Sequence, residues 1–422
     1  MKNRQVCHSF VFALIFSSLL SAGVSASDHP VSVNTTIHRA ALSASDQQVG
    51  DDFGDAVAVD GNTAVVGAMF TNAAYVFQKP AGGWKNMTQT AKLTPSDNAG
   101  HFGAAVAISG DTVVIGAPYT TVNGNVEQGA VYVFVKPASG WKDMTETAKL
   151  TGSGLGTSGY DLLGSSVSIS GNTIAVGVPN TIQGLGLAFV YVKPQKGWTN
   201  STQTAVLYTD PSWLGFGVAV AVSGDTVVVG ANGCCAGGNP TVGEAYVYVK
   251  PSSGWTTTSN YNADLAGSDV GSSDFYGESV AIDGDTVLVG SPQTYSSEVG
   301  AAYVFVKPPT GWATMVQTAE LDPPNNSGEG FFGQSVAISG NQAFIGAPFT
   351  KVEGAYQHGA AYVFVRPKNG WQNTAKFNAK LTNSKAYWYF GQSVSVDSTT
   401  AVVGFSGTYK TDSGTDVFWG IP

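Results

Sequence analysis

Aromatic and acidic side chains gather at equivalent places along this chain, close to a repeated aromatic-Gly pair. Flat aromatic rings suit the apolar faces of sugars or the anchor residues of a protein partner. The candidate ligand-binding residues are Trp213, Phe275, Glu278, Tyr295, Phe331, Tyr387, Trp388 and Tyr389. The alternative interpretation is that most of these rings pack beneath the loops as small apolar clusters.

Two further features of these segments could do chemistry. The acidic residues could bind a cation or orient hydroxyl groups, although surface carboxylates that only solubilise are more common; besides Glu278 they include Asp210, Asp274, Glu298 and Glu329. Adjacent cysteines stand in "NGCCAGG" (232–238). In an exported protein, Cys234 and Cys235 could form a strained and reducible vicinal disulfide. Two unpaired thiols, or pairing between molecules, are the alternatives.

Catalytic and metal-binding patterns are poor in this sequence. The histidines after residue 26 are scattered and show no zinc-ligand spacing; they are His29, His38, His101 and His358. No G-x-S-x-G elbow stands between a strand and a helix. Carboxylates are plentiful enough for a glycosidase pair, but no spacing shows which two would face each other. We therefore expect no catalytic residue, no bound metal and no cofactor.

A glycine repeat supplies the scaffold for these residues. Seven aromatic-Gly or Leu-Gly pairs occur, and another glycine follows the glycine of each pair at a constant spacing of 13 residues. The pairs are Phe53-Gly54, Phe102-Gly103, Leu163-Gly164, Phe216-Gly217, Tyr276-Gly277, Phe332-Gly333 and Phe390-Gly391, and the following glycines are Gly67, Gly116, Gly177, Gly230, Gly290, Gly346 and Gly404. The repeat length of 49 to 61 residues falls in the range expected of propeller blades.

Each repeat predicts four strands, named A to D. In the second repeat these are 104–109, 112–118, 129–137 and 145–151. A two-residue turn such as Ser109-Gly110 predicts an A–B hairpin. A K/R-P-x-x-G-W turn follows strand C. Its proline ends the strand, because proline has no N–H to donate to the sheet. Strand A is apolar on both faces and must be covered on both, as in blades stacked around an axis.

The two ends of the chain predict how the ring closes. The seventh repeat stops after strand C (415–420), and "HRAALSASD" (38–46) resembles the missing strand D. We therefore expect an all-β, seven-bladed β-propeller of four-stranded antiparallel blades, with residues 38–422 as one domain. The N-terminal strand would complete blade seven and leave no blade unfinished.

The first 26 residues have the basic start, short apolar core and small-residue end of a signal peptide, followed by a linker at 27–37. We expect cleavage near Ala26 and a secreted, periplasmic or extracellular location. Loss of Lys2 and Arg4 would move the formal charge from −9 to −11. That charge argues against nucleic acid as a partner. We expect no membrane insertion and a monomer.

With its F-G and G-A-P motifs and aromatic-rich C strands, the chain resembles the FG-GAP repeats of integrin alpha-chain propellers and their bacterial relatives. The resemblance covers nearly all of residues 38–420. In family members that bind calcium, a D-x-D-x-D-G-type loop joins strands A and B. Here that junction is as short as "SGD" (109–111), and a two-residue turn cannot wrap six or more oxygens around the ion. The family's metal sites are therefore not carried over, and calcium on the loop face is left as the alternative.

The predicted function follows from which segments vary. The A–B and C–D turns are short and uniform, whereas the B–C and D–A connections differ between repeats and share the opposite end of the propeller. Variable loops on a rigid scaffold commonly carry binding sites. We expect a secreted, non-catalytic module that recognises a glycan or, as in integrin-like adhesion, a protein. A glycan-cleaving enzyme is the third hypothesis.

Overall fold

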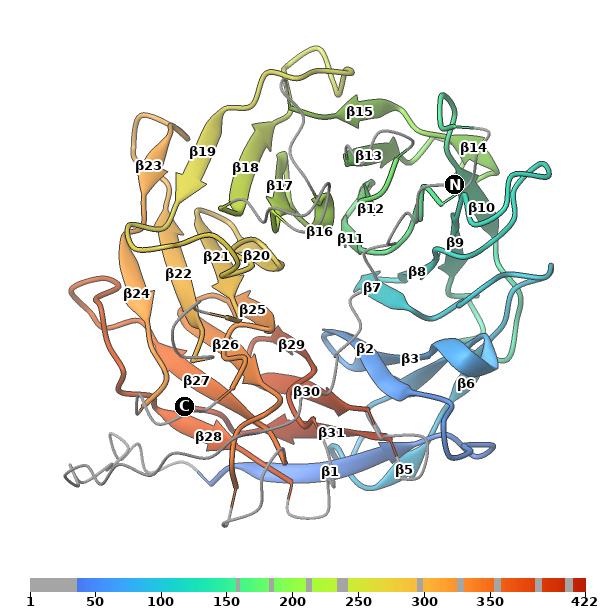
Figure 1. Ribbon diagram of the computed structural model, residues 1–422. Coiled ribbons are helices and arrows are strands. Elements are labelled where there is room, and N and C mark those ends of the chain that lie inside the picture. The colour runs from blue at the N-terminus through green and yellow to red at the C-terminus, as the bar shows by residue number, and fades with distance from the viewer. Residues whose placement is uncertain are drawn as a thin grey trace, which may run out of the picture.

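Strands joined by glycine-centred turns build seven sheets that stand around a common axis (Figure 1). The protein is described here by a computed structural model, which covers residues 36–156, 160–181, 186–209, 215–233, 242–293, 299–324, 330–352, 358–383, 389–406 and 413–422. The seven-bladed propeller predicted from the repeat is confirmed. One short 3₁₀ helix, Met69–Thr71, is present in this described part, where no helix is long and apolar enough to cross a membrane.

The blades are numbered in chain order, and each is listed from its innermost strand outward. Blade 1 contains β2 (Phe53–Asp60), β3 (Thr63–Ala68), β4 (Ala73–Gln78) and β6 (Ala91–Leu93). Blade 2 contains β7 (Ala105–Ser109), β8 (Thr112–Ala117), β9 (Ala130–Val135) and β10 (Ala148–Thr151). Blade 3 contains β11 (Val167–Ser170), β12 (Thr173–Val178), β13 (Leu187–Val192) and β15 (Ala205–Leu207). Blade 4 contains β16 (Phe216–Ser223), β17 (Thr226–Ala231), β18 (Glu244–Val249) and β19 (Ala263–Ala266).

The remaining blades follow the same order. Blade 5 contains β20 (Ser279–Asp283), β21 (Thr286–Ser291), β22 (Ala301–Val306) and β24 (Ala319–Leu321). Blade 6 contains β25 (Ser335–Ser339), β26 (Gln342–Ala347), β27 (Ala360–Val365) and β28 (Ala379–Leu381). Blade 7 contains β29 (Ser393–Asp397), β30 (Thr400–Phe405), β31 (Gly414–Trp419) and β1 (His38–Ser43).

The N-terminal strand closes the ring as predicted. Strand β1 pairs antiparallel with β31, in a register that places His38 opposite Trp419 and Leu42 opposite Thr415. The His38 and Trp419 rings stack with their centroids 5.4 Å apart. The last strand of blade 7 is therefore supplied by the first strand of the chain.

The predicted start of strand D was too early. Strand β10 begins at Ala148 and not at residue 145, because the residues before it pair with the preceding blade. Met144 forms a parallel bridge with Leu93 of blade 1. The same pairing is extended elsewhere into short strands added at the outer edge of the preceding blade: β5 (Met87–Thr88), β14 (Ser201–Thr202) and β23 (Met315–Val316).

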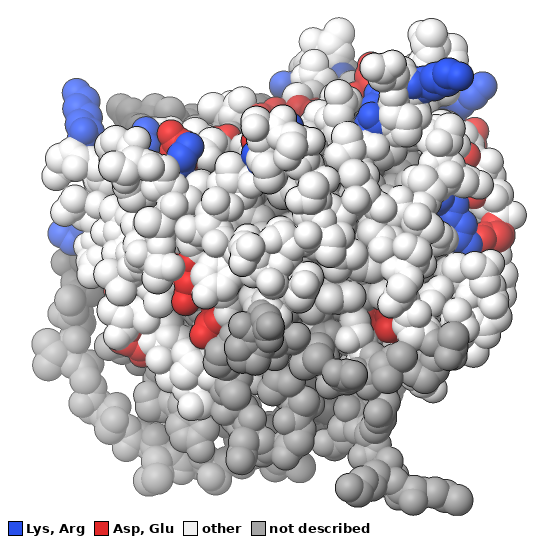
Figure 2. All heavy atoms as spheres, turned by 90° about the horizontal axis from the view of Figure 1, so that it is seen from above, with Lys and Arg blue, Asp and Glu red and all other residues white. Residues whose placement is uncertain are grey.

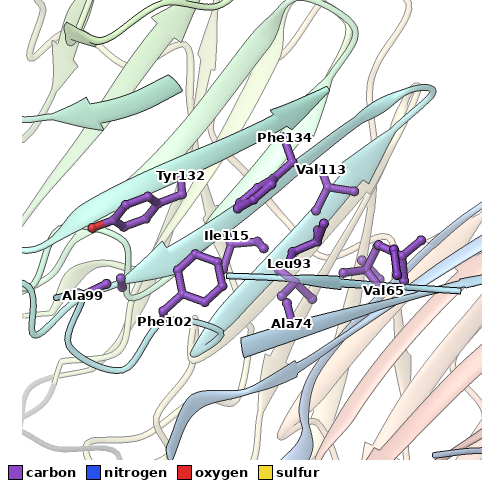
Figure 3. Packing of buried hydrophobic residues seen from close by; sticks show 14 of the residues in the cluster. Val65, Ala74, Leu93, Ala99, Phe102, Val113, Ile115, Tyr132 and Phe134 are labelled. Carbon is purple, nitrogen blue, oxygen red and sulfur yellow. The ribbon is translucent and has the colours of Figure 1, made fainter. Parts of the chain in front are cut away.

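The apolar core is divided into clusters between neighbouring blades. The cluster in Figure 3 joins Val65, Ala74 and Leu93 of blade 1 to Phe102, Val113, Ile115, Tyr132 and Phe134 of blade 2. The Phe102 ring lies edge-on to the Tyr132 ring, with centroids 5.3 Å apart. Burial on both faces of each sheet explains why the strands are nearly continuous apolar runs.

The two glycines of each repeat allow adjacent blades to touch through their backbones. The Gly103 N–H donates to the Gly116 carbonyl within blade 2 at 3.1 Å. A Cβ added to Gly116 would overlap the Gly164 carbonyl oxygen of blade 3. The equivalent overlap at the ring closure is between Gly404 and the Gly54 carbonyl oxygen. The 13-residue spacing of the two glycines therefore results from two contacts: a hydrogen bond within a blade and a close backbone approach between blades.

Hydrogen bonds between A–B turns link all seven blades at one end of the propeller, the turn end. In each blade, the Asp or Ser that opens the turn accepts a hydrogen bond from a backbone N–H in the turn of the next blade. The acceptors are Asp60, Ser109, Ser170, Ser223, Asp283, Ser339 and Asp397. The Asp carboxylates and Ser hydroxyls of these short turns thus hold neighbouring blades together.

The C–D turns lie at the same end. In each K/R-P-x-x-G-W turn the glycine N–H donates to the proline carbonyl at about 2.9 Å, and the tryptophan is buried. The Lys or Arg that opens each turn lies near the A–B turn; Lys136, for example, pairs with Asp111 at 3.3 Å. In a side view of the ring, Lys and Arg side chains gather toward one end (Figure 2). The opposite end, formed by the B–C and D–A connections, is called the loop end.

Candidate functional site

Seven equivalent residues surround the loop end because each D–A connection closes with the same turn. The residue before each aromatic-Gly pair has a positive φ, and its carbonyl accepts the N–H of the residue three positions on. These residues are Asp52, His101, Leu162, Gly215, Phe275, Phe331 and Tyr389. The pair's glycine takes the positive φ that the third position of a type II turn needs.

Six of these seven positions hold a residue other than glycine in the left-handed region. That conformation costs about 1 kcal/mol or more for an L-residue. Strain of this kind is concentrated at functional sites. The side chains at these positions are therefore candidates for function, and three of them are aromatic: Phe275, Phe331 and Tyr389.

Two of the predicted aromatic residues are joined by a third that the sequence analysis missed. Phe349 lies between them, with its ring centroid 4.5 Å from that of Phe331 and 4.8 Å from that of Tyr389. All three side chains are half-buried. They come from the D–A and B–C connections of blade 6 and the following D–A connection. We call Phe331, Phe349 and Tyr389 the aromatic trio.

A related group of rings lines a hollow of about 550 Å³ between blades 1 and 2. The His101 ring lies 4.3 Å from Tyr119 and 5.3 Å from Phe70, centroid to centroid. Phe70 is 43% exposed. The residues that line the hollow are Met69, Phe70, Asn72, Asp97, Asn98, Ala99, Gly100, His101, Tyr119 and Thr121. We call this hollow the blade 1–2 pocket.

Two residues that the sequence analysis missed, Tyr119 and Phe349, could have been found from their position in the repeat. Tyr119 and Phe349 each follow a G-A-P triplet, at 116–118 and 346–348. They occupy the same place in the B–C connections of blades 2 and 6, each beside the left-handed residue of its own blade. Comparing loops at a fixed offset from the second glycine would have identified them together.

Glu278 was predicted as a ligand-binding residue, and in the structure its carboxylate is hydrogen-bonded to a residue of the preceding blade. The Asn232 side chain donates to the Glu278 carboxylate at 2.7 Å. Burial raises the pKa of Glu278, and hydrogen bonds from Asn232 and Gln334 oppose that shift. Phe275 is half-buried three positions earlier. Glu278 is therefore bonded to a neighbouring blade at the start of strand A.

Acidic residues also gather in the first D–A connection. The Asp51 carboxylate accepts hydrogen bonds from Ser413 Oγ at 3.0 Å and from the Phe53 N–H at 3.2 Å. Burial raises the pKa of Asp55 to about 6. Burial, together with the charges of Asp55 and Asp51, raises the pKa of Asp52 to about 7. Within the described ranges, no group of three His, Cys, Asp or Glu side chains is placed to hold a metal ion.

The remaining predicted residues lie outside the described residues. They are Trp213, Tyr295, Tyr387, Trp388, Cys234, Cys235 and the acidic residues Asp210, Glu298 and Glu329. The fourth acidic candidate, Asp274, is described, and its carboxylate accepts the Gly271 N–H at 2.6 Å. The predicted vicinal disulfide therefore stays a prediction.

Comparison with known proteins identifies the family. The FG-GAP repeat model matches residues 37–77, 87–134, 215–248, 260–305 and 315–364, more than half of the chain. The chain belongs to the FG-GAP repeat family. This confirms the resemblance seen in the repeated glycine motifs. No curated protein matches this FG-GAP repeat protein.

Two solved structures are similar to this FG-GAP repeat protein. Hydrazine synthase of Kuenenia stuttgartiensis aligns with a TM-score of 0.54 at 12% identity, covering 87% of this chain and 97% of that chain. The computationally designed Ika8 protein aligns with a TM-score of 0.49 at 14% identity, covering 90% of this chain and 100% of that chain. At such low identity the likeness to the synthase concerns the fold alone.

Proposed function

We propose that this FG-GAP repeat protein is exported after cleavage near Ala26 and acts as a monomeric, non-catalytic module. Its loop end would recognise an extracellular glycan. The observation that carries the proposal is the aromatic trio, in which Phe331 and Tyr389 both pack on Phe349 and all three rings remain partly exposed. Rings held by several loops on a rigid ring of sheets suit the apolar faces of sugars.

Recognition of a protein partner, as in adhesion, is the second candidate, and a different patch favours it. Val126 and Tyr160 are 53% and 46% exposed. The Tyr160 N–H donates to the Val126 carbonyl at 3.2 Å, so the two side chains come from adjoining loops of blades 2 and 3. Exposed apolar side chains grouped in this way are typical of protein interfaces.

A glycan array probed with the secreted protein tests the first candidate. We expect specific hits that are weakened about tenfold by Phe349→Ala. The matched control is Phe377→Ala, which removes a half-buried ring that packs on Tyr362 in the C–D connection of blade 6, away from the loop end. Hits that persist in Phe349→Ala, or an array with no hits, would contradict glycan recognition by the aromatic trio. Loss of capture of a protein ligand in Tyr160→Ala would favour the second candidate.

A further inference from the structure

The blade 1–2 pocket combines an exposed aromatic ring with a set of hydrogen-bonding side chains. Phe70 provides the ring, His101 packs edge-on to Phe70, and Tyr119 packs on His101. Asn98 and Thr121 are exposed at the same hollow. The volume of about 550 Å³ falls within the usual range for small-molecule sites.

The loops that form this pocket are held to each other. The Tyr119 N–H donates to the Gly100 carbonyl at 3.2 Å, and the Gly100 N–H donates to Thr120 Oγ1 at 3.1 Å. A Cβ on Gly100 would overlap the Tyr119 carbonyl. Across the pocket, the Phe102 N–H donates to the Asn72 side chain at 3.0 Å. The walls are thus fixed before any ligand binds, which lowers the entropy cost of binding.

The charges around the pocket select among ligand classes. Asp97 is the single carboxylate among the lining residues, and it is already engaged by Lys149 at 2.5 Å and by the Tyr132 hydroxyl at 2.7 Å. The lining includes no lysine or arginine. Among the lining residues, an acidic ligand would therefore meet no guanidinium or ammonium group, and a basic ligand would meet only a neutralised carboxylate. Glu127, whose charge acts on the Tyr119 hydroxyl, lies outside the lining. Amide, hydroxyl and aromatic groups remain, and these suit an uncharged polyhydroxyl compound.

We propose that the blade 1–2 pocket binds one neutral sugar ring, stacked on Phe70 and hydrogen-bonded by Asn98 and Thr121. The inference rests on the proposed glycan recognition and names its subsite and ligand class. The pocket is built from different blades than the aromatic trio. The two sites can therefore be tested separately.

The test uses the secreted protein and methyl glycosides of glucose, galactose, mannose and N-acetylglucosamine as probes, with glucuronic acid and N-acetylneuraminic acid as charged comparisons. Saturation-transfer NMR and titration calorimetry measure binding. We expect at least one neutral glycoside to bind, and Phe70→Ala to weaken it about tenfold, which corresponds to about 1.4 kcal/mol. Asn98→Ala should weaken it several-fold; Asn98 is exposed, so its replacement leaves the fold intact.

Tyr261→Ala is the matched control, because Tyr261 is also 43% exposed but packs on Tyr246 at the outer part of blade 4. Its affinity should equal that of the wild type. Unchanged affinity in both Phe70→Ala and Asn98→Ala would overturn the subsite, while array hits lost in Phe349→Ala would leave the proposed function standing. Equal binding of the charged sugars would overturn the ligand class. Absence of binding to every glycan would refute both proposals.

Discussion

The Asp397 carboxylate of blade 7 accepts a hydrogen bond from the Gly61 N–H of blade 1 at 2.6 Å. This contact closes the series of seven bonds between A–B turns. It also joins blade 1 to blade 7, the blade whose two chain ends, β31 and β1, are held together without a covalent connection. Asp397 therefore stabilises the closure of the propeller together with the pairing of β1 and β31.

Asp397→Ala should lower the free energy of unfolding by about 1 kcal/mol, because one hydrogen bond to a charged acceptor at the surface is lost. Denaturant unfolding measures the change. Asp285→Ala is the control, since Asp285 also lies in an A–B turn but forms an exposed pair with Lys307 at 3.1 Å, worth less than about 1 kcal/mol. Equal losses in the two variants would argue against a role of Asp397 in closure.

Gly404→Ala should destabilise the protein more strongly, by about 2–3 kcal/mol, because its Cβ would overlap the Gly54 carbonyl and blades 7 and 1 would have to separate. Ser393 Oγ, which donates to the same carbonyl at 2.7 Å, would also lose its bond. Thermal unfolding is the measurement. Gly82→Ala is the control, since nothing lies within 4 Å of a Cβ placed there. A Gly404→Ala protein as stable as Gly82→Ala would contradict the proposed backbone contact.

Glu320 of blade 5 occupies the strand position that Lys149 holds in blade 2. Lys149 pairs with Asp97 beside Tyr132, whereas Glu320 lies beside Asp269, which accepts the Tyr303 hydroxyl hydrogen bond at 3.0 Å. Burial, followed by the charges of Asp322 and Asp269, raises the pKa of Glu320. Ionising Glu320 therefore costs free energy in the folded state and reduces stability as the pH rises above about 4.5.

Glu320→Lys should raise the free energy of unfolding by about 1–2 kcal/mol near pH 8, because a cation would then face Asp269 as in blade 2. The gain should shrink toward pH 4.5, where Glu320 is protonated in the wild type. Glu320→Gln separates the two effects, since it removes the titration without adding a cation. Unfolding curves from pH 4.5 to 8 give the result, and a gain that does not depend on pH would contradict the explanation.

The sequence was sufficient for the blade count and the closure because both depend on contacts that recur in every repeat. The glycine spacing of Gly103 and Gly116 is imposed on each blade alike, and the missing seventh strand D had a clear counterpart at residues 38–46. The start of strand D was misplaced because Met144 pairs across blades. A pattern read within one repeat does not reveal a partner in another.

The candidate site was harder to predict for the same reason. Phe70, His101 and Tyr119 come from three connections, and only the stacking of blades brings their rings together. Glu278 was predicted as a ligand-binding residue, but the sequence gave no sign that its hydrogen-bond partner, Asn232, is supplied by the preceding blade. Contacts between variable loops have no periodicity, so the sequence alone could indicate the loop end but not the pocket within it.

Asp55 should give the protein a stability that falls as the pH rises. Its folded pKa of about 6 lies above the ordinary value of 3.8 because of burial, so the folded state holds a proton that the unfolded chain releases. Between pH 4 and 6, stability should therefore decline in the wild type. Asp55→Asn should make this decline less steep, with Asp52 and Glu320 still contributing to it, and should be more stable than the wild type at pH 7. Asp111→Asn is the control, because Asp111 lies in an exposed turn and pairs with Lys136; this variant should show the same decline in stability as the wild type. If the decline disappeared in Asp111→Asn, Asp55 would not be the responsible group.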